Sequence, residues 1–199
     1  MITLLIARHG NTFDPGDILL RVGKQTDLPL SNSGREQAKK LGVFLHENHP
    51  KIDRVFVSSL KRTQETAAIA WPENVFEINP IFDEVDYGID DGKPENEVVA
   101  RIGEIALKRW EEHGIAPADW KVNAEKIKQD WKDFANQCIA KYPDGITILV
   151  VTSNGIARFA PAILANPCDL PKMKTGAISA FQFTTEQHWQ LNYWNNAPV

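Results

Sequence analysis

Cysteine is almost absent from this sequence. Cys138 and Cys168 are the only two among 199 residues, and neither belongs to a Cys-x-x-Cys pair or a Cys/His cluster. A disulfide framework and a cysteine-bound zinc ion are therefore excluded, because each needs several cysteines at characteristic spacing. So few cysteines are typical of a protein in a reducing compartment, and we expect a cytoplasmic location.

The sequence also contains no long apolar run at its start. The run at 2–7 has no basic leader and ends at Arg8. A membrane span needs about 20 apolar residues and a signal peptide needs a basic start, so neither is expected. The run instead predicts a buried first strand, and we expect no membrane partner.

An excess of positive charge is the third missing feature. The chain has 22 Lys and Arg against 26 Asp and Glu, which gives a formal net charge of -4. Without an overall basic field, no nucleic-acid partner is expected, and any anion must be held by a local group of residues. The remaining composition, 43% hydrophobic and 24% charged, is that of an ordinary globular protein. We predict a single domain over 1–199.

Short β-branched segments alternate with helical patterns along the chain. Strands are predicted at 2–7, 54–58, 146–152, 177–184 and 188–194, the last two as a hairpin at the sheet edge. Helices are predicted at 33–48, 61–70, 95–112, 119–141 and 156–165. This alternation indicates an α/β fold with a mostly parallel sheet. It also leaves a helical insertion at about 95–141 and a long irregular connection at 72–95.

Polar residues follow three of the predicted strands. Arg8 and His9 end the first strand, the second runs into Ser58 and then Arg62, and the third ends in the stretch 152–155. Ligands of open α/β sheets bind beyond the carboxyl ends of the strands, so these residues are expected to form a site for a tetrahedral anion. Each residue also has a plainer interpretation: His9 as a surface or capping residue, and Arg62 as the ion-pair partner of Glu65 on its own helix.

Beyond the Arg8-His9-Gly10 tripeptide, the chain resembles a known family. The resemblance is carried by five blocks that occur in the family's order, at 4–12, 26–38, 57–67, 82–88 and 148–158. These blocks are similar to those of the histidine phosphatase superfamily, which includes the cofactor-dependent phosphoglycerate mutases. The resemblance implies a three-layer α/β/α fold like that of phosphoglycerate mutase, and a phosphatase that acts on a small phosphorylated metabolite or binds inorganic phosphate.

The resemblance also assigns catalytic roles. His9 corresponds to the nucleophile, because a neutral imidazole offers the lone pair that forms a phosphohistidine. Arg8 and Arg62 correspond to the clamp on the phosphoryl oxygens, and their positive field keeps His9 neutral. Glu84 corresponds to the proton donor for the leaving group. A solvated carboxylate in a loop is the plainer interpretation of Glu84.

Further residues are expected to contact the phosphate. Thr12 and Ser58 resemble hydroxyl donors, Asn11 is placed to donate through its amide, and Arg21 corresponds to a basic residue near the pocket mouth. No metal or cofactor is implied, because the two arginines supply the charge that Mg²⁺ gives other phosphoryl-transfer sites. The acidic stretch at 83–91 lacks the full calcium-loop pattern with its closing Glu.

One position departs from the family. Ser153, followed by Asn154, stands where related sequences carry a second histidine that donates to the phosphate. Loss of one such donor costs about 10²–10³ in rate. Three readings follow: a phosphatase in which Ser153 or Asn154 replaces the imidazole, a phosphate-binding relative without turnover, and a mutase. The mutase is the weakest, because Asp14-Pro15 replaces the Trp-Asn pair that such mutases carry.

Substrate specificity is expected to come from the connection at 72–95 and from the helices at 95–141. Three aromatic side chains there either line a pocket or pack in the core: Tyr87, Trp110 and Trp120. The predicted edge strand at 188–194 exposes an aromatic face through which a homo-oligomer could form.

Overall fold

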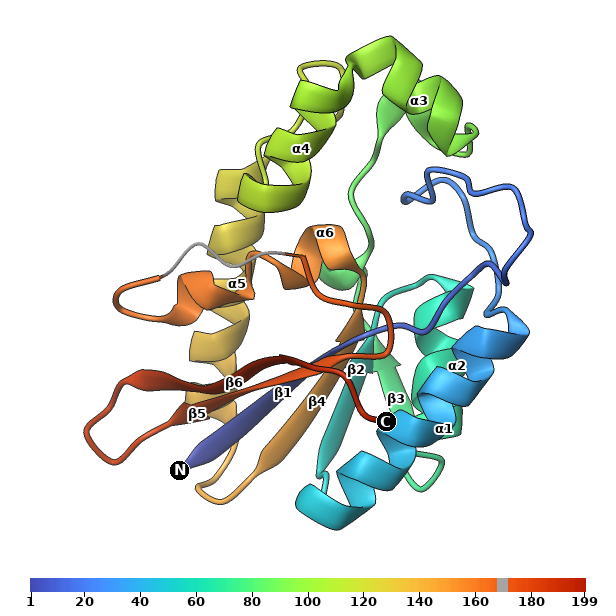
Figure 1. Ribbon diagram of the computed structural model, residues 1–199. Coiled ribbons are helices and arrows are strands. Elements are labelled where there is room, and N and C mark those ends of the chain that lie inside the picture. The colour runs from blue at the N-terminus through green and yellow to red at the C-terminus, as the bar shows by residue number, and fades with distance from the viewer. Residues whose placement is uncertain (168–171) are drawn as a thin grey trace.

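A single mixed β-sheet forms the centre of the protein, for which we obtained a computed structural model that describes residues 1–167 and 172–199. Its six strands lie in the order β3-β2-β4-β1-β5-β6 (Figure 1). Their bounds are β1 Ile2–Arg8, β2 Arg54–Val57, β3 Phe76–Ile78, β4 Thr147–Thr152, β5 Ile178–Phe183 and β6 Trp189–Asn196. The first four in this order run parallel, and β5 and β6 form an antiparallel hairpin at the edge. The predicted α/β class and mostly parallel sheet are confirmed.

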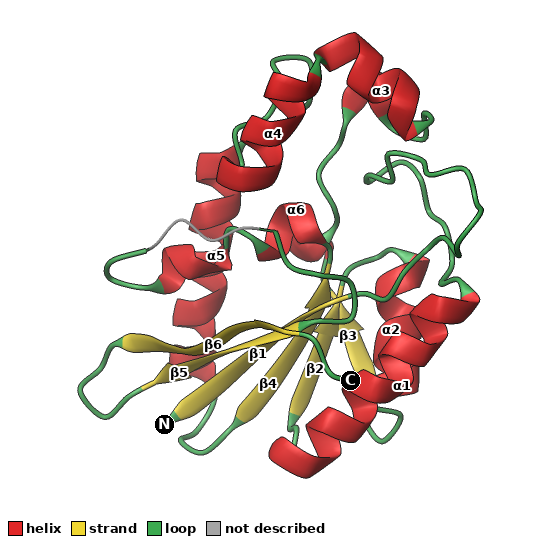
Figure 2. Ribbon diagram, viewed as in Figure 1, coloured by secondary structure: helices red, strands yellow, loops and turns green. Residues whose placement is uncertain are grey.

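Helices cover both faces of this sheet (Figure 2). Their bounds are α1 Asn32–Asn48, α2 Lys61–Ala70, α3 Glu95–Ile102, α4 Glu104–His113, α5 Ala124–Lys141 and α6 Asn154–Ala157. Side chains of α1 and α2 pack on one face and side chains of α5 on the other. Within the stretch predicted as an insertion, α5 therefore belongs to a layer, whereas α3 and α4 lie beyond the carboxyl ends of the strands (Figure 1).

The apolar residues of β1 alternate between the two layers. Leu4 and Ile6 belong to the core under α5, and Leu5 and Ala7 belong to the core under α1 and α2. Alternate side chains of a strand point to opposite faces, so a central strand covered on both sides must be apolar throughout. This accounts for the unbroken run at 2–7 and places the residues that follow β1 and β4 in the middle of one sheet edge.

Several predicted boundaries were wrong. The helix predicted at 95–112 is broken at Gly103, whose φ of +83° is outside the helical region. The one predicted at 119–141 begins at Ala124, because the Asn123 side chain accepts a hydrogen bond from the Lys126 amide and caps it.

Two further segments also differ from the expectation. In place of a helix at 156–165 there is the short α6 followed by a 3₁₀ turn, Ala160–Ile163, which contains Pro161. Proline lacks the N–H that a continuing α-helix would use. The connection at 72–95 contains the short edge strand β3 and two 3₁₀ turns, Pro80–Phe82 and Gly88–Asp90.

Two other findings bear on the sequence expectations. Cys168 lies outside the described residues, and Cys138 is a buried free thiol of α5.

Among the helices that the structure describes, none combines the length and apolar character that a membrane crossing requires.

Candidate active site

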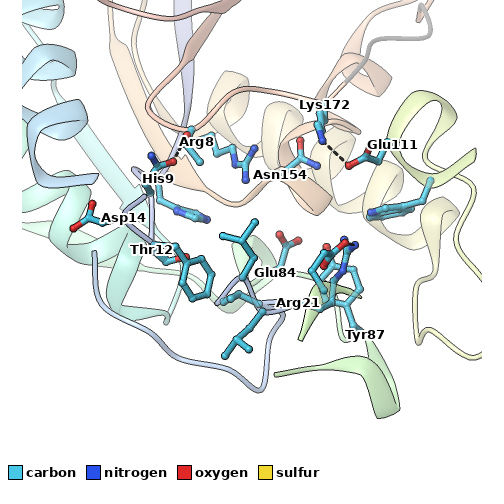
Figure 3. Close-up of a pocket in the computed structure, with 18 of the residues that line it drawn as sticks. Arg8, His9, Thr12, Asp14, Arg21, Glu84, Tyr87, Glu111, Asn154 and Lys172 are labelled. Carbon is cyan, nitrogen blue, oxygen red and sulfur yellow. Dashed lines mark hydrogen bonds and ion pairs between the residues drawn. The ribbon is translucent and has the colours of Figure 1, made fainter. Parts of the chain in front are cut away.

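A cavity of about 570 Å³ opens at the carboxyl ends of β1 and β4, which is within the size range of small-molecule sites. It receives residues from the end of β1, from the segment that follows β1, from the loop before α3, from α4 and from the start of α6 (Figure 3). The lining residues are Arg8, His9, Asn11, Thr12, Phe13, Asp14, Pro15, Leu19, Leu20, Arg21, Val22, Glu84, Tyr87, Glu95, Trp110, Glu111, Asn154, Lys172 and Thr175.

His9 presents one free ring nitrogen in this cavity. Its side chain is buried, and its Nδ1 lies 2.7 Å from the carbonyl oxygen of Gly10. A carbonyl only accepts, so Nδ1 donates and the lone pair resides on Nε2. Burial, together with the charges of Arg62 and Arg8, lowers the pKa of His9 well below its usual value near 6.5. The ring is therefore neutral at physiological pH, with the lone pair of Nε2 available.

Two guanidinium groups flank His9. Arg8 donates from Nη1 to the carbonyl of Met173 at 2.5 Å and lines the cavity. Arg62 is fully buried behind the lining, where it donates to the carbonyls of Thr26 and Gly23 at 3.0 and 3.1 Å. Burial lowers the pKa of both side chains, yet arginine remains cationic in proteins.

The plainer interpretation of Arg62 does not describe its contacts. Glu65, the helix partner considered from the sequence, pairs instead with Arg35 at 3.1 Å. The guanidinium of Arg62 is directed to the backbone of the segment after β1 and is coupled electrostatically to His9 and Glu84. It belongs to the same charged cluster as Arg8.

Several buried donors around the cavity have no hydrogen-bond partner among the described residues. They are Nε of Arg8, Arg21 and Arg62, Oγ of Ser153 and Nη1 of Arg158. A buried donor left unpaired costs about 1–3 kcal/mol. Arg8 and Arg21 line the cavity, whereas Arg62, Ser153 and Arg158 lie outside its lining, and an anion bound beside Arg8 would satisfy the Nε donor of that residue.

Glu84 presents a buried carboxyl on the side of the cavity across from His9 (Figure 3). It follows the 3₁₀ turn Pro80–Phe82, is 5% exposed, and its Oε1 accepts from the Val85 amide at 2.9 Å. Burial raises the pKa of Glu84 even though Arg62 and Arg8 oppose this shift. The side chain is not the solvated loop carboxylate of the plainer interpretation, and its burial favours the protonated form.

The predicted phosphate donors divide into two groups. Asn11 and Thr12 line the cavity, although the Asn11 amide already donates to Ser33 Oγ at 3.3 Å and accepts from Thr175 Oγ1 at 2.5 Å. Ser58 is buried outside the lining. Its hydroxyl lies 2.7 Å from Thr63 Oγ1 and accepts from the backbone amide at the start of α2 at 3.2 Å.

Ser153 and Asn154 occupy different positions relative to the cavity. Ser153 is fully buried, does not belong to the lining, and has no partner for its hydroxyl within the described part of the chain. Asn154 lines the cavity beside Arg8 (Figure 3), and its Oδ1 accepts from the Met173 amide at 2.9 Å. Because that contact fixes the oxygen of the amide, the Nδ2 donors of Asn154 are the ones left for a ligand.

Arg21, predicted to lie near the pocket mouth, lines the cavity. It pairs with Glu95, and its guanidinium lies 5.2 Å from the ring centre of Tyr87 and 5.1 Å from that of Trp120. Of the three aromatic residues considered from the sequence, Tyr87 and Trp110 line the cavity, whereas Trp120 packs behind it.

Sequence reasoning missed several residues on the side of the cavity away from His9. This side, which includes Arg21, Glu95, Glu111 and Lys172, is called the wall below. Lys172 and Glu111 form an ion pair at 2.5 Å, and Glu95 and Thr175 also reach the cavity. No local motif marks these residues, because they come from α3, α4 and the segment before β5 and meet only in the folded chain. The backbone of Met173, which holds both Arg8 and Asn154, was likewise not predictable from a side-chain motif.

The acidic stretch at 83–91 does not form a cation site. Its carboxylates are used separately: Asp83 accepts from Ser59, Asp90 pairs with Arg101, and Asp91 accepts from the Gly23 amide. Within residues 1–167 and 172–199, no three acidic, histidine or cysteine side chains gather as metal ligands would.

Comparisons with known proteins agree with this geometry. A family model described as the histidine phosphatase superfamily (branch 1) matches residues 4–197. Fructose-2,6-bisphosphatase TIGAR B of Danio rerio is 36% identical over 97 residues, which are 46% of this chain and 37% of that relative. A 2,3-bisphosphoglycerate-dependent phosphoglycerate mutase of Tropheryma whipplei is 32% identical over 115 residues, 55% of this chain and 51% of that relative.

Solved structures extend the likeness to the whole chain. A mycobacterial glucosyl-3-phosphoglycerate phosphatase superposes with a TM-score of 0.82 at 21% identity, covering 98% of this chain and 99% of that one. At this identity the likeness establishes the fold, which is that of phosphoglycerate mutase-like phosphatases. The matched stretches span about half or less of the two curated relatives.

Proposed function

Since the chain belongs to branch 1 of the histidine phosphatase superfamily, we propose that it hydrolyses phosphate monoesters of small metabolites through a phosphohistidine intermediate on His9. The observation that carries the proposal is a neutral imidazole with a free Nε2, placed among Arg8, Arg62 and a carboxyl of raised pKa at one cavity. Each of these properties is needed for the same reaction, and nothing in the core of the fold requires them together.

The first step transfers the phosphoryl group to His9. Nε2 of His9 attacks phosphorus, so that a P–N bond forms while the P–O bond to the leaving group breaks. Arg8 and Arg62 stabilise the charge on the transferring oxygens. Glu84 gives its proton to the leaving oxygen, which departs as an alcohol.

The second step reverses these roles. A water molecule attacks the phosphohistidine, the P–N bond breaks, and the lone pair returns to Nε2. Glu84, now a carboxylate, accepts the proton of that water and is restored for the next cycle. Release of inorganic phosphate then leaves the protein unchanged.

Asn154 takes over the role of the second imidazole in this proposal. Its Oδ1 is held by the Met173 amide at 2.9 Å, and its Nδ2 donates to a phosphoryl oxygen. The hydroxyl of Ser153 is buried behind the lining without a partner among the described residues, so Asn154 is the one of the two that reaches the cavity. An amide donor is uncharged, so we expect turnover that is slower than with an imidazolium but not abolished.

A relative that binds phosphate without turning it over is the second candidate. It is favoured by the replacement of the second histidine by Ser153. The mutase remains the weakest candidate. Asp14, at a position where mutases carry a Trp-Asn pair, accepts from the amides of Asn32 and Ser33 at 3.1 and 2.9 Å and so anchors the start of α1.

The experiment that tests the proposal is hydrolysis of an aryl phosphate, together with trapping of the intermediate. The protein is expected to release phosphate and to carry an acid-labile, base-stable phosphoryl group that His9→Ala removes. His188→Ala, at an exposed histidine of the β5–β6 hairpin, is the matched control and should keep both signals. Turnover that persists in His9→Ala contradicts the nucleophile assignment, and binding of phosphate without turnover supports the second candidate.

A further inference from the structure

We propose that the substrate carries its phosphate as the only anionic group, and that the leaving group is uncharged with an apolar face. This inference rests on the proposed function and adds the substrate class to it. The argument starts from the charged groups that line the cavity beyond Arg8, His9 and Glu84. Each cation there is already paired with a carboxylate of the same wall.

Arg21 is the first of these cations. Its guanidinium pairs with Glu95 and lies over the adjacent rings of Tyr87 and Trp120, 5.2 and 5.1 Å from their centres. Its side chain is 12% exposed. Turning toward a second anionic group would break the ion pair and both aromatic contacts, so Arg21 is held as part of the wall.

Lys172 is the second cation. Its Nζ lies 2.5 Å from Oε1 of Glu111 on α4, and the pair spans one side of the cavity (Figure 3). A carboxylate or second phosphate that enters on this side meets Glu111 together with Lys172, so that attraction and repulsion nearly cancel. Specificity is a difference of affinities, and a repelling carboxylate in the wall disfavours an anionic leaving group as effectively as a missing cation.

The remaining lining combines one carboxylate, Asp14, with uncharged polar side chains and an apolar stretch. Asp14 lines the cavity with no ion pair within the described residues, and hydrogen bonds from Ser33 hold its pKa at about 2, so it is ionised. Apolar lining comes from the segment after β1, where Phe13, Leu20 and Val22 reach the cavity. An uncharged leaving group with an apolar face fits this wall, whereas a second anion would compete with Glu95 or Glu111 for the two cations, Arg21 and Lys172, that the described residues place there.

The test compares two phosphate monoesters that differ in one group. Glycerol 1-phosphate carries a CH₂OH where 3-phosphoglycerate carries a carboxylate, and benzyl phosphate adds an apolar leaving group. We expect kcat/KM for glycerol 1-phosphate to exceed that for 3-phosphoglycerate by about 10-fold or more at low salt, with benzyl phosphate better still.

One variant and its control test whether the charged wall causes the difference in kcat/KM between the two esters. Glu111→Gln frees Lys172 and should narrow the gap between the two esters by about 3-fold or more. Glu125→Gln, which removes the acid of an exposed Glu-Lys pair of α5 (2.9 Å to Lys128), is the control and should leave the ratio unchanged. An equal change in both variants contradicts the proposal.

The outcomes separate this inference from the function on which it rests. If aryl phosphate is hydrolysed but 3-phosphoglycerate is used as well as or better than glycerol 1-phosphate, the substrate class is wrong and the phosphatase stands. If nothing is hydrolysed, the proposed phosphatase function is wrong. Calorimetric binding of glycerol 1-phosphate and 3-phosphoglycerate then still tests the proposed ligand class. Tighter binding of 3-phosphoglycerate, or no binding of either ligand, then overturns it.

Discussion

Gly155 lies so close to Glu84 that a methyl group in place of its hydrogen would come within 2.2 Å of Oε1 of Glu84. The glycine at the start of α6 therefore leaves room for the carboxyl of Glu84, the proposed proton donor. A Gly155→Ala substitution is expected to push the carboxyl away from the cavity. We predict a loss of about 10²-fold in kcat/KM for alkyl phosphates, which need a proton on the leaving oxygen.

The same variant has an internal control. 4-Nitrophenyl phosphate has a leaving group that departs without a proton, so its hydrolysis should fall much less. Thermal unfolding followed by circular dichroism checks that the variant is folded. An equal loss with both substrates would mean that the alanine disturbs the phosphate site rather than the position of Glu84.

Glu84→Gln tests the proton donor directly. Glutamine keeps the size of the side chain but cannot transfer a proton, so hydrolysis of alkyl phosphates should fall by about 10²–10⁴-fold. Burial raises the pKa of Glu84, so the protonated form is lost only as pH rises above the usual carboxyl range. The wild-type rate should therefore decline on the alkaline side through that pKa, and this decline should be absent from the residual rate of the variant. If the hydrolysis rate of Glu84→Gln shows the same alkaline decline as that of the wild type, Glu84 is not the proton donor.

The buried, neutral state of His9 should be visible in the pH dependence of stability. In the unfolded chain His9 takes up a proton near pH 6.5, whereas its lowered pKa keeps it neutral in the folded protein. The contribution of neutral His9 to the free energy of unfolding is therefore complete above pH 6.5. It is lost by about 1.4 kcal/mol per pH unit as the pH falls toward the pKa that His9 has in the folded protein.

Urea unfolding at pH 7.0 and pH 5.5, without phosphate in the buffer, measures this effect. The free energy of unfolding should decrease from pH 7.0 to pH 5.5 in the wild type. We expect this decrease to be about 1 kcal/mol smaller in His9→Gln. His188→Gln should behave as the wild type does. Identical pH dependence in all three proteins would show that His9 binds protons equally in the folded and unfolded states.

The proposal that Asn154 replaces the second imidazole can be tested by removing its donor and, separately, by restoring a histidine at position 153. Asn154→Asp keeps the acceptor for the Met173 amide but removes the Nδ2 donors and adds a negative charge, so phosphate should bind at least about 10-fold more weakly. Ser153→His is expected to raise the rate of phosphoryl transfer, because it restores a donor at the family's usual position. Calorimetric titration with phosphate and single-turnover kinetics measure the two effects. Tighter phosphate binding in Asn154→Asp would exclude a donor role for Asn154.

The central strands and the layer helices were predictable because their signals are local. A strand covered on both faces must be apolar at every position, as in 2–7, and an amphipathic helix such as α1 shows its buried face at a fixed spacing. Local signals failed where the backbone depends on a single residue. Gly103 divides the predicted helix at 95–112, and Pro161 converts the end of another into a 3₁₀ turn.

The candidate site divides in the same way. Arg8, His9 and Glu84 were identified from motifs and do meet at one cavity. Ser58 follows its strand as expected, yet its hydroxyl is used at the start of α2, a choice that depends on the neighbouring Thr63. The pairing of Arg21 with Glu95 and of Lys172 with Glu111 joins residues 74 and 61 positions apart in the sequence, so no spacing rule could indicate it.

The sequence by itself determined the α/β architecture, the family and the choice of Arg8, His9 and Glu84 as candidate site residues, because these depend on residue types in runs and short motifs that act over a few positions. The tertiary structure alone decided the protonation of those groups and the character of the wall opposite them. Burial and neighbouring charge set the pKa of His9 and Glu84, and both are properties of the assembled cavity. The partners of Arg21 and Lys172 are likewise brought within contact only when α3 and α4 fold over the strand ends.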